Sequence, residues 1–145
     1  MTQERTNRIK ALTSIAEKYH ISAIYAFGSR ASEVMAWTNG ETVDIEPIES
    51  DVDIGVLLRH KAGLSVQEKV QITIEMEDLL GVPRVDLVII SEADPFLALD
   101  IIKGELIFCN ELDAQAEYEL YNRYKKICTH KNTPSTVYSF IVKPS

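Results

Sequence analysis

Apolar residues recur along the chain at two different spacings, which predict alternating helices and strands. Near the N-terminus, Ile9, Leu12 and Ala16 are three or four positions apart, which places them on one face of a helix over the first twenty residues. Runs rich in β-branched and aliphatic residues predict strands. These runs cover residues 21–27, 51–58, 85–90 and 106–108. The third run is apolar enough to lie inside a sheet.

A helix is predicted after each strand. These helices cover residues 30–36, 65–80, 94–103 and 111–131. The second of them carries Val66, Val70 and Ile74 four positions apart, as expected for one helix face. It ends at Gly81 and Pro83, because a glycine just past a helix, with a proline soon after, is a common C-terminal signal.

The alternation of strands and helices predicts a mixed α/β (α+β) fold, in which a small mixed β-sheet is flanked by helices. A chain of 145 residues has the usual size of one domain. We expect residues 1–131 to form this domain and residues 132–145 to be a C-terminal tail. Residues 37–50 fit neither spacing and contain the turn signal Asn39-Gly40 and the strand breaker Pro47, so they are predicted to be an insertion loop.

The composition is that of a folded globular protein, with 46% hydrophobic and 26% charged residues. No run of about 18 apolar residues is present, so no membrane span is expected. The N-terminus lacks the apolar region of a secretory signal, and we expect a cytoplasmic protein. Cys109 and Cys128 are too far apart for a metal knuckle, and the three histidines form no zinc-binding pair.

The net charge of −7 is concentrated in one stretch of the chain. From Glu33 to Asp53 there are seven acidic residues and no Lys or Arg, so the rest of the chain is balanced. An acidic protein is poorly suited to grip the phosphates of nucleic acid, and we expect no direct nucleic-acid binding. Because the stretch leads into Asp51 and Asp53, we interpret it as the cation-attracting mouth of a site.

Three aspartates stand at positions where acids are costly. Asp51 and Asp53 are two positions apart in a strand, so both side chains leave the same face. Asp86 interrupts the next apolar strand. If these strands are neighbours, the three carboxylates converge and repel one another, and Mg²⁺ is the cation that suits such oxygen ligands. In the alternative, Asp51 caps the strand start, Asp53 faces solvent and Asp86 is a polar residue of an edge strand.

A second candidate feature is the turn Gly28-Ser29-Arg30 between the first strand and the short helix. Backbone N–H groups and a hydroxyl at the start of a helix form a phosphate-binding nest, and Arg30 adds positive charge beside it. The alternative is a plain turn with Ser29 as the helix N-cap. The turn is not a Walker A loop, because the G-K-[ST] sequence is absent.

Together, the motifs Gly28-Ser29-Arg30-Ala31, Asp51-Val52-Asp53 and Val85-Asp86-Leu87 resemble the minimal nucleotidyltransferase (MNT) pattern of the polymerase-β-like superfamily. The resemblance covers roughly residues 8–126 and implies the polymerase-β-like nucleotidyltransferase fold. The 21 residues between Ser29 and Asp51 make a longer gap than the compact family pattern, which places the predicted insertion loop near the mouth of the site.

The resemblance also implies roles for the motif residues. Asp51 and Asp53 would ligate two Mg²⁺ ions, and Asp86 would hold a metal near the acceptor hydroxyl and help to remove its proton. Gly28 and Ser29 would bind the outer phosphates of ATP, with Arg30 either supporting them or packing locally. The reaction would be an in-line displacement at the α-phosphate that releases pyrophosphate.

Stand-alone proteins of this kind resemble MntA-type antitoxins of HEPN/MNT toxin–antitoxin systems, which transfer AMP from ATP to a tyrosine of a partner HEPN ribonuclease toxin. The small size and acidic charge agree with a protein acceptor. Two other hypotheses stay open at this point: an antitoxin that acts by binding its partner without catalysis, and a nucleotidyltransferase for a small-molecule acceptor.

Overall fold

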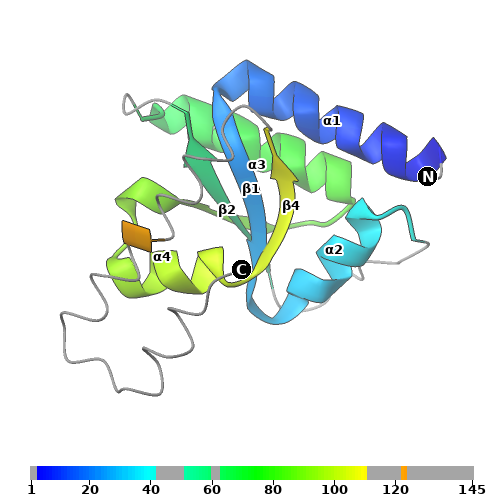
Figure 1. Ribbon diagram of the computed structural model, residues 1–145. Coiled ribbons are helices and arrows are strands. Elements are labelled where there is room, and N and C mark those ends of the chain that lie inside the picture. Colours follow the sequence, from blue (N-terminus) through cyan, green and yellow to red (C-terminus); the bar gives the residue numbers. More distant parts are fainter. Residues whose placement is uncertain (1–2, 42–50, 60–62, 111–121, 124–145) are drawn as a thin grey trace, which may run out of the picture.

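The computed structural model of the protein describes residues 3–41, 51–59, 63–110 and 122–123 (Figure 1). Its α-helices are α1 (Gln3–Tyr19), α2 (Ala31–Thr38), α3 (Val66–Leu80) and α4 (Pro95–Ile102). Its strands are β1 (Ile21–Phe27), β2 (Val52–Leu58), β3 (Val85–Ile89) and β4 (Glu105–Cys109). Two 3-10 turns, η1 (Gly28–Arg30) and η2 (Ile90–Glu92), follow β1 and β3. The predicted mixed fold, with a small sheet flanked by helices, is confirmed.

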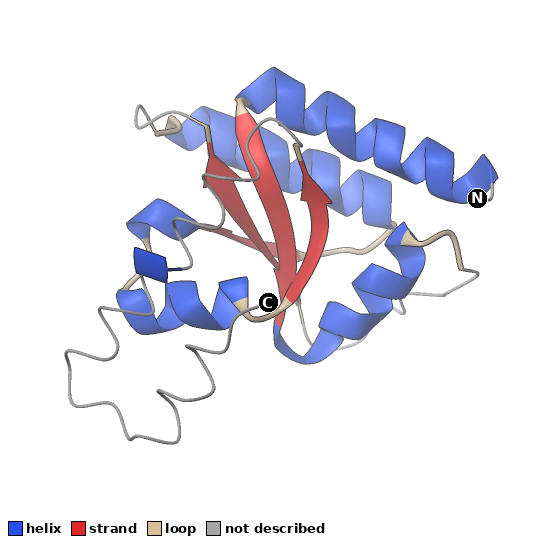
Figure 2. Ribbon diagram, in the orientation of Figure 1, coloured by secondary structure: helices blue, strands red, loops and turns tan. Residues whose placement is uncertain are grey.

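The four strands form one mixed sheet in the order β3-β2-β1-β4 (Figure 2). β1 is antiparallel to both β2 and β4, whereas β2 and β3 are parallel and are connected through α3. The prediction that β3 lies inside the sheet is wrong, because β3 is an edge strand among the strands that the structure describes. Its apolar character has another cause: Leu87 packs against the core on one face of the sheet and Val88 against the core on the other.

Helices cover both faces of the sheet. Helices α1, α2 and α3 supply one core, in which Ile54 of β2 packs with Leu12 and Ile72. Helix α4 covers part of the opposite face (Figure 1). On that face, Leu57 of β2 packs with Ile101. Because side chains alternate along a strand, Asp53 lies on the α4 face, in line with Leu57. Within the described residues, no helix is both long enough and apolar enough to cross a membrane.

The ends of α3 agree with prediction, but its buried face does not. Ser65 and Glu68 form a capping box at its N-terminus, and Gly81 ends it in the left-handed conformation. The predicted apolar face is exposed, with Val66 at 77%, Val70 at 51% and Ile74 at 43%. A second series with the same spacing faces the sheet instead, and its members are Ile72, Met76 and Leu80. The periodicity fits both series, and only the packing of α3 on the sheet selects one.

The predicted insertion loop begins too early in the chain. Trp37 and Thr38 belong to α2, and the Trp37 side chain is only 7% exposed. Arg8 of α1 fixes this end of α2, because its guanidinium lies 4.8 Å from the centroid of the Trp37 ring and donates to the Trp37 carbonyl. Residues 42–50 lie outside the described residues. So do the predicted tail and the predicted helix 111–131, except for Asn122 and Arg123, which are helical.

Candidate functional site

The ends of β1, β2 and β3 bring the predicted site residues to one place on the sheet. In the strand register, Asp53 of β2 lies opposite Phe27 of β1 on one side and opposite Asp86 of β3 on the other. Paired residues of neighbouring strands share a face and are separated by about 4.8 Å of backbone spacing. The register therefore places Asp53 and Asp86 next to each other on one face of the sheet.

Helix α4 packs on β2 next to these acids. A methyl group on Gly55, two residues after Asp53, would lie 2.4 Å from Cγ2 of Ile101, so α4 contacts the β2 backbone directly there. Gly104, which follows α4, approaches β1 so closely that a Cβ atom would lie 2.5 Å from the Ala26 carbonyl oxygen. Beyond these contacts the surface opens, because Asp53 is half-buried and Asp86 is exposed.

Gly28 brings the predicted phosphate-binding turn against the carboxylate of Asp53. Its φ of 76° lies in the left-handed region, and an added Cβ would lie 2.3 Å from Oδ2 of Asp53. The next residue, Ser29, is exposed within η1, and the Ala31 N–H closes the turn by donating to the Gly28 carbonyl. Only a glycine fits here, because a side chain would displace the carboxylate and strain the backbone.

Arg30 packs locally, which is one of the two roles expected for it from the sequence, the other being support of the phosphates. It is only 5% exposed, and its Nη2 lies 3.3 Å from Oε2 of Glu33 in the first turn of α2. Its guanidinium is thus buried and paired, whereas Gly28 and Ser29 beside it are exposed. The exposed part of the turn consists of a glycine and a serine.

The three aspartates interact electrostatically. Burial raises the pKa of Asp53 above its ordinary value, and the negative charges of Asp86 and Asp51 raise it further. The charged form of Asp53 is therefore disfavoured by both its surroundings and its neighbours. A bound cation would reverse this effect, since it favours the charged form of each carboxylate.

The sequence pattern did not identify Arg84, which forms an ion pair with Asp51. Its Nε lies 3.1 Å from Oδ1 of Asp51. The two residues directly precede the register pair Val52 and Val85, so extending the parallel register by one step places them opposite each other. That register, once β2 and β3 are known to be neighbours, is the signal that would have found Arg84.

The three aspartates are the kind of ligands that a hard divalent cation prefers, but their carboxylates are not grouped around a common point. Asp51, Asp53 and Asp86 offer carboxylate oxygens, which are the ligands that Mg²⁺ prefers. Across the part of the chain that the structure describes, no three His, Cys, Asp or Glu side chains are grouped so that they could hold a metal ion. The carboxylate of Asp51 is paired with Arg84 instead.

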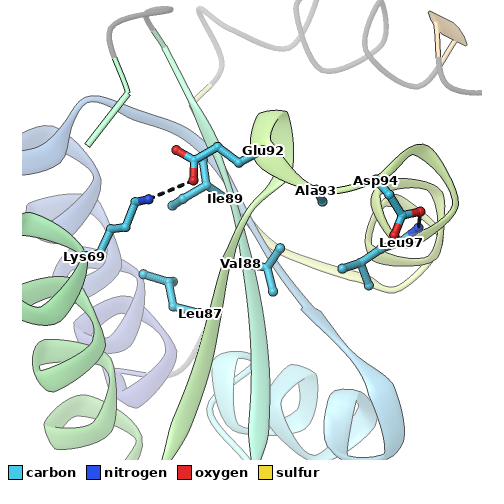
Figure 3. Close-up of a pocket in the computed structure, with 8 residues that line it drawn as sticks. All are labelled: Lys69, Leu87, Val88, Ile89, Glu92, Ala93, Asp94 and Leu97. Carbon is cyan, nitrogen blue, oxygen red and sulfur yellow. Dashed lines mark hydrogen bonds and ion pairs between the residues drawn. The ribbon is translucent and has the colours of Figure 1, made fainter. Parts of the chain in front are cut away.

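A groove along the outer edge of β3 lies apart from this site. It has a volume of about 400 Å³, and its apolar surface comes from residues such as Leu87, Val88 and Leu97 (Figure 3). Lys69 of α3 and Glu92 of η2 form an ion pair at 2.8 Å within its lining. None of the three aspartates and neither residue of the exposed turn lines it, so the groove is not the predicted site.

Comparisons with known proteins identify the family and the fold. A family model described as polymerase beta, nucleotidyltransferase matches residues 10–113. No curated protein matches the chain. A solved toxin–antitoxin structure with AMP-PNP is similar at 16% identity, with a TM-score of 0.56, over 92% of this chain and 98% of that chain.

Two further solved structures are similar over almost their whole length. One is a tri-AMPylated Shewanella oneidensis HEPN toxin in complex with an MNT antitoxin, at 15% identity and a TM-score of 0.54, over 96% of this chain and 99% of that chain. The other is the toxin–antitoxin MntA–HepT, at 15% identity and a TM-score of 0.54, over 95% and 99%. At such identities the likeness shows a shared fold.

Proposed function

The chain belongs to the polymerase beta nucleotidyltransferase family, and from that premise we propose that it is an Mg²⁺-dependent antitoxin that adenylylates its toxin. It transfers AMP from ATP to a tyrosine of a partner HEPN ribonuclease and releases pyrophosphate. The observation that carries the proposal is the register of Asp53 with Asp86, together with the contact of Gly28 on Asp53. This geometry places the carboxylates beside the exposed turn to which we assign phosphate binding.

The residues of the exposed turn hold the nucleotide. The backbone N–H groups of Gly28 and Ser29 and the Ser29 hydroxyl donate hydrogen bonds to the outer phosphates of ATP. Asp51, Asp53 and Asp86 hold the Mg²⁺ ions, which supply charge neutralisation for the triphosphate and the leaving pyrophosphate. Gly28 keeps the turn close to Asp53, so the phosphates and the carboxylates are held side by side.

The transfer itself is one displacement at phosphorus. The tyrosine oxygen of the acceptor forms a bond to the α-phosphorus, while the bond from that phosphorus to the oxygen bridging to the β-phosphate breaks. Pyrophosphate leaves with both electrons of the broken bond. Asp86 is exposed on the edge strand, where an acceptor hydroxyl can reach it, and its carboxylate accepts the tyrosine proton.

A protein acceptor is favoured by the similar solved structures. They include an AMPylated HEPN toxin in complex with an MNT antitoxin, and a toxin–antitoxin structure with AMP-PNP. The matches span 98–99% of the similar chains, so the likeness extends over the whole of each. The exposure of Asp86 supports the same conclusion, since a folded protein can present a hydroxyl only to an open site.

The test uses ATP labelled on either the α- or the γ-phosphate, with Mg²⁺ and the protein encoded by the neighbouring gene. We expect label on the partner from α-labelled ATP only, and none with Asp53→Asn. Label from γ-labelled ATP would indicate a kinase. Pyrophosphate release with small hydroxyl compounds, but no labelled partner, would favour a small-molecule acceptor. Neutralisation of the toxin by folded Asp53→Asn would favour an antitoxin that acts by binding alone.

A further inference from the structure

Arg84 sits at the metal-binding end of the sheet on a firmly anchored backbone. Its carbonyl accepts a hydrogen bond from the Val52 N–H at 3.2 Å, directly beside Asp51. The following N–H, that of Val85, donates to Oε2 of Glu77 at 3.0 Å. These two bonds tie the residue both to β2 and to the last turn of α3. The position of the Arg84 backbone therefore does not depend on its side chain.

The side chain, in contrast, is held only weakly. The Arg84 side chain is 69% exposed and that of Asp51 is 42% exposed, so their ion pair lies in water. Pairs of this kind contribute little to stability, because solvent screens them and ordering long side chains costs entropy. The guanidinium can leave Asp51 without disturbing the fold.

The three aspartates differ in their partners, because the ion pair with Arg84 involves Asp51. The Asp51 carboxylate has the guanidinium as its partner, whereas the side chains of Asp53 and Asp86 have no hydrogen bond or ion pair to another described residue. A divalent cation that binds all three carboxylates must therefore compete with Arg84 for Asp51, whereas no described side chain is paired with the other two carboxylates.

We infer that Arg84 is a positioning residue that serves as the resident counter-cation of Asp51 and is displaced from it when the divalent cation binds. It holds Asp51 beside Asp53 while the site is empty of metal, and it lowers the affinity for a free divalent ion. This inference rests on the proposed function, because it takes the three aspartates to be the metal ligands.

The test is Mn²⁺ binding to the whole protein without nucleotide, followed by electron paramagnetic resonance of the free ion. For Arg84→Ala we expect the Kd for Mn²⁺ to fall about three- to fivefold, the scale set by an exposed ion pair. Arg84→Lys keeps the charge without the planar fork and should give an intermediate value. Lys10→Ala removes the same charge from an exposed position on α1 and controls for the change in net charge.

A Kd in Arg84→Ala that matches that of Lys10→Ala, or that rises above the wild-type value, would overturn the inference. A second comparison locates the effect: in an Asp51→Asn background, Arg84→Ala should no longer change the Kd. Failure of this inference and failure of the proposed function give different results. Wild-type binding that is lost in Asp53→Asn supports the metal site whatever Arg84 does, whereas wild-type protein that binds no Mn²⁺ contradicts both.

Discussion

Gly28 and Asp53 are in contact across β1 and β2, so that one added methyl group on Gly28 would lie 2.3 Å from Oδ2 of Asp53. Real atoms do not approach so closely, and a side chain at this position would force the carboxylate to move. The position of the Asp53 carboxylate on β2 therefore depends on the absence of a side chain at Gly28. A substitution that moves the backbone at Gly28 is expected to move the Asp53 carboxylate as well.

Gly28→Ala should reduce nucleotidyl transfer by at least about 100-fold, because displacement of a reacting group by about 1 Å costs that much. It should also lower the free energy of unfolding by about 1–2 kcal/mol, since alanine is strained at a φ of 76°. Transfer assays and urea denaturation of the same preparation measure the two effects separately.

Gly81→Ala is the matched control for backbone strain. Gly81 has a similar φ of 69°, but no atom lies within 4 Å of the position that its Cβ would take. We expect a comparable loss of stability and unchanged transfer activity at a temperature where the variant is folded. Equal loss of activity in both variants would show that strain, and not the contact with Asp53, causes the defect.

The raised pKa of Asp53 predicts that this residue destabilises the metal-free fold at neutral pH. The folded protein holds the Asp53 proton more tightly than the unfolded chain, whose ordinary value is 3.8. The free energy of unfolding due to this group therefore falls as the pH rises from that value through the raised pKa, and it is recovered on acidification. In EDTA, Asp53→Asn should be more stable than wild type at pH 7, and the difference should shrink towards pH 4. A difference that is constant with pH, or of opposite sign, would contradict this assignment.

The buried face of α3 predicts opposite outcomes for two substitutions only two positions apart. Ile72 is fully buried, so Ile72→Ala should cost about 2–5 kcal/mol of unfolding free energy. Val70 is 51% exposed, and Val70→Ala should change it by no more than about 0.5 kcal/mol. The fluorescence of the chain's one tryptophan, Trp37, reports unfolding in both variants. Comparable losses would mean that the described orientation of α3 is wrong.

The contact between α1 and the end of α2 predicts a role for Arg8 in stability. Arg8→Ala removes a cation–π contact with Trp37 and a charged hydrogen bond to its carbonyl, together worth about 1–2 kcal/mol. Arg8→Lys should recover only part of this, because lysine has one side-chain nitrogen, whereas Arg8 donates to the Trp37 and Glu41 carbonyls through Nη1 and pairs with Glu4 through Nε. Thermal unfolding of the three proteins checks the order, and a wild-type melting temperature in Arg8→Ala would refute it.

The order and limits of the elements were accessible from the sequence where local chemistry sets them. Ser65 with Glu68 and Gly81 mark the two ends of α3, and Asp94 caps α4 by accepting hydrogen bonds from the first N–H groups of that helix. Asp53 and Asp86 were recognisable because an acid inside an apolar strand is conspicuous. These signals lie within a few residues of the feature that they predict.

Features that depend on distant parts of the chain were not accessible. The apolar content of β3 reports that its faces are covered, but it does not reveal that the strand lies at the edge of the described sheet. The role of Arg84 depends on the register between β2 and β3, and that of Trp37 on the packing of α1 against α2. Neither relationship is encoded in the spacing of residues along one element.

The intact mass of the partner protein after co-expression tests most directly whether this chain adenylylates its partner. With the wild-type chain, the partner should gain the mass of one or more AMP groups, and fragmentation should place each of them on tyrosine. With Asp53→Asn, produced at the same level and shown by circular dichroism to be folded, the partner should keep its unmodified mass. An unmodified partner with the wild-type chain, or an equally modified partner with Asp53→Asn, would contradict the assignment of this chain as an adenylylating antitoxin.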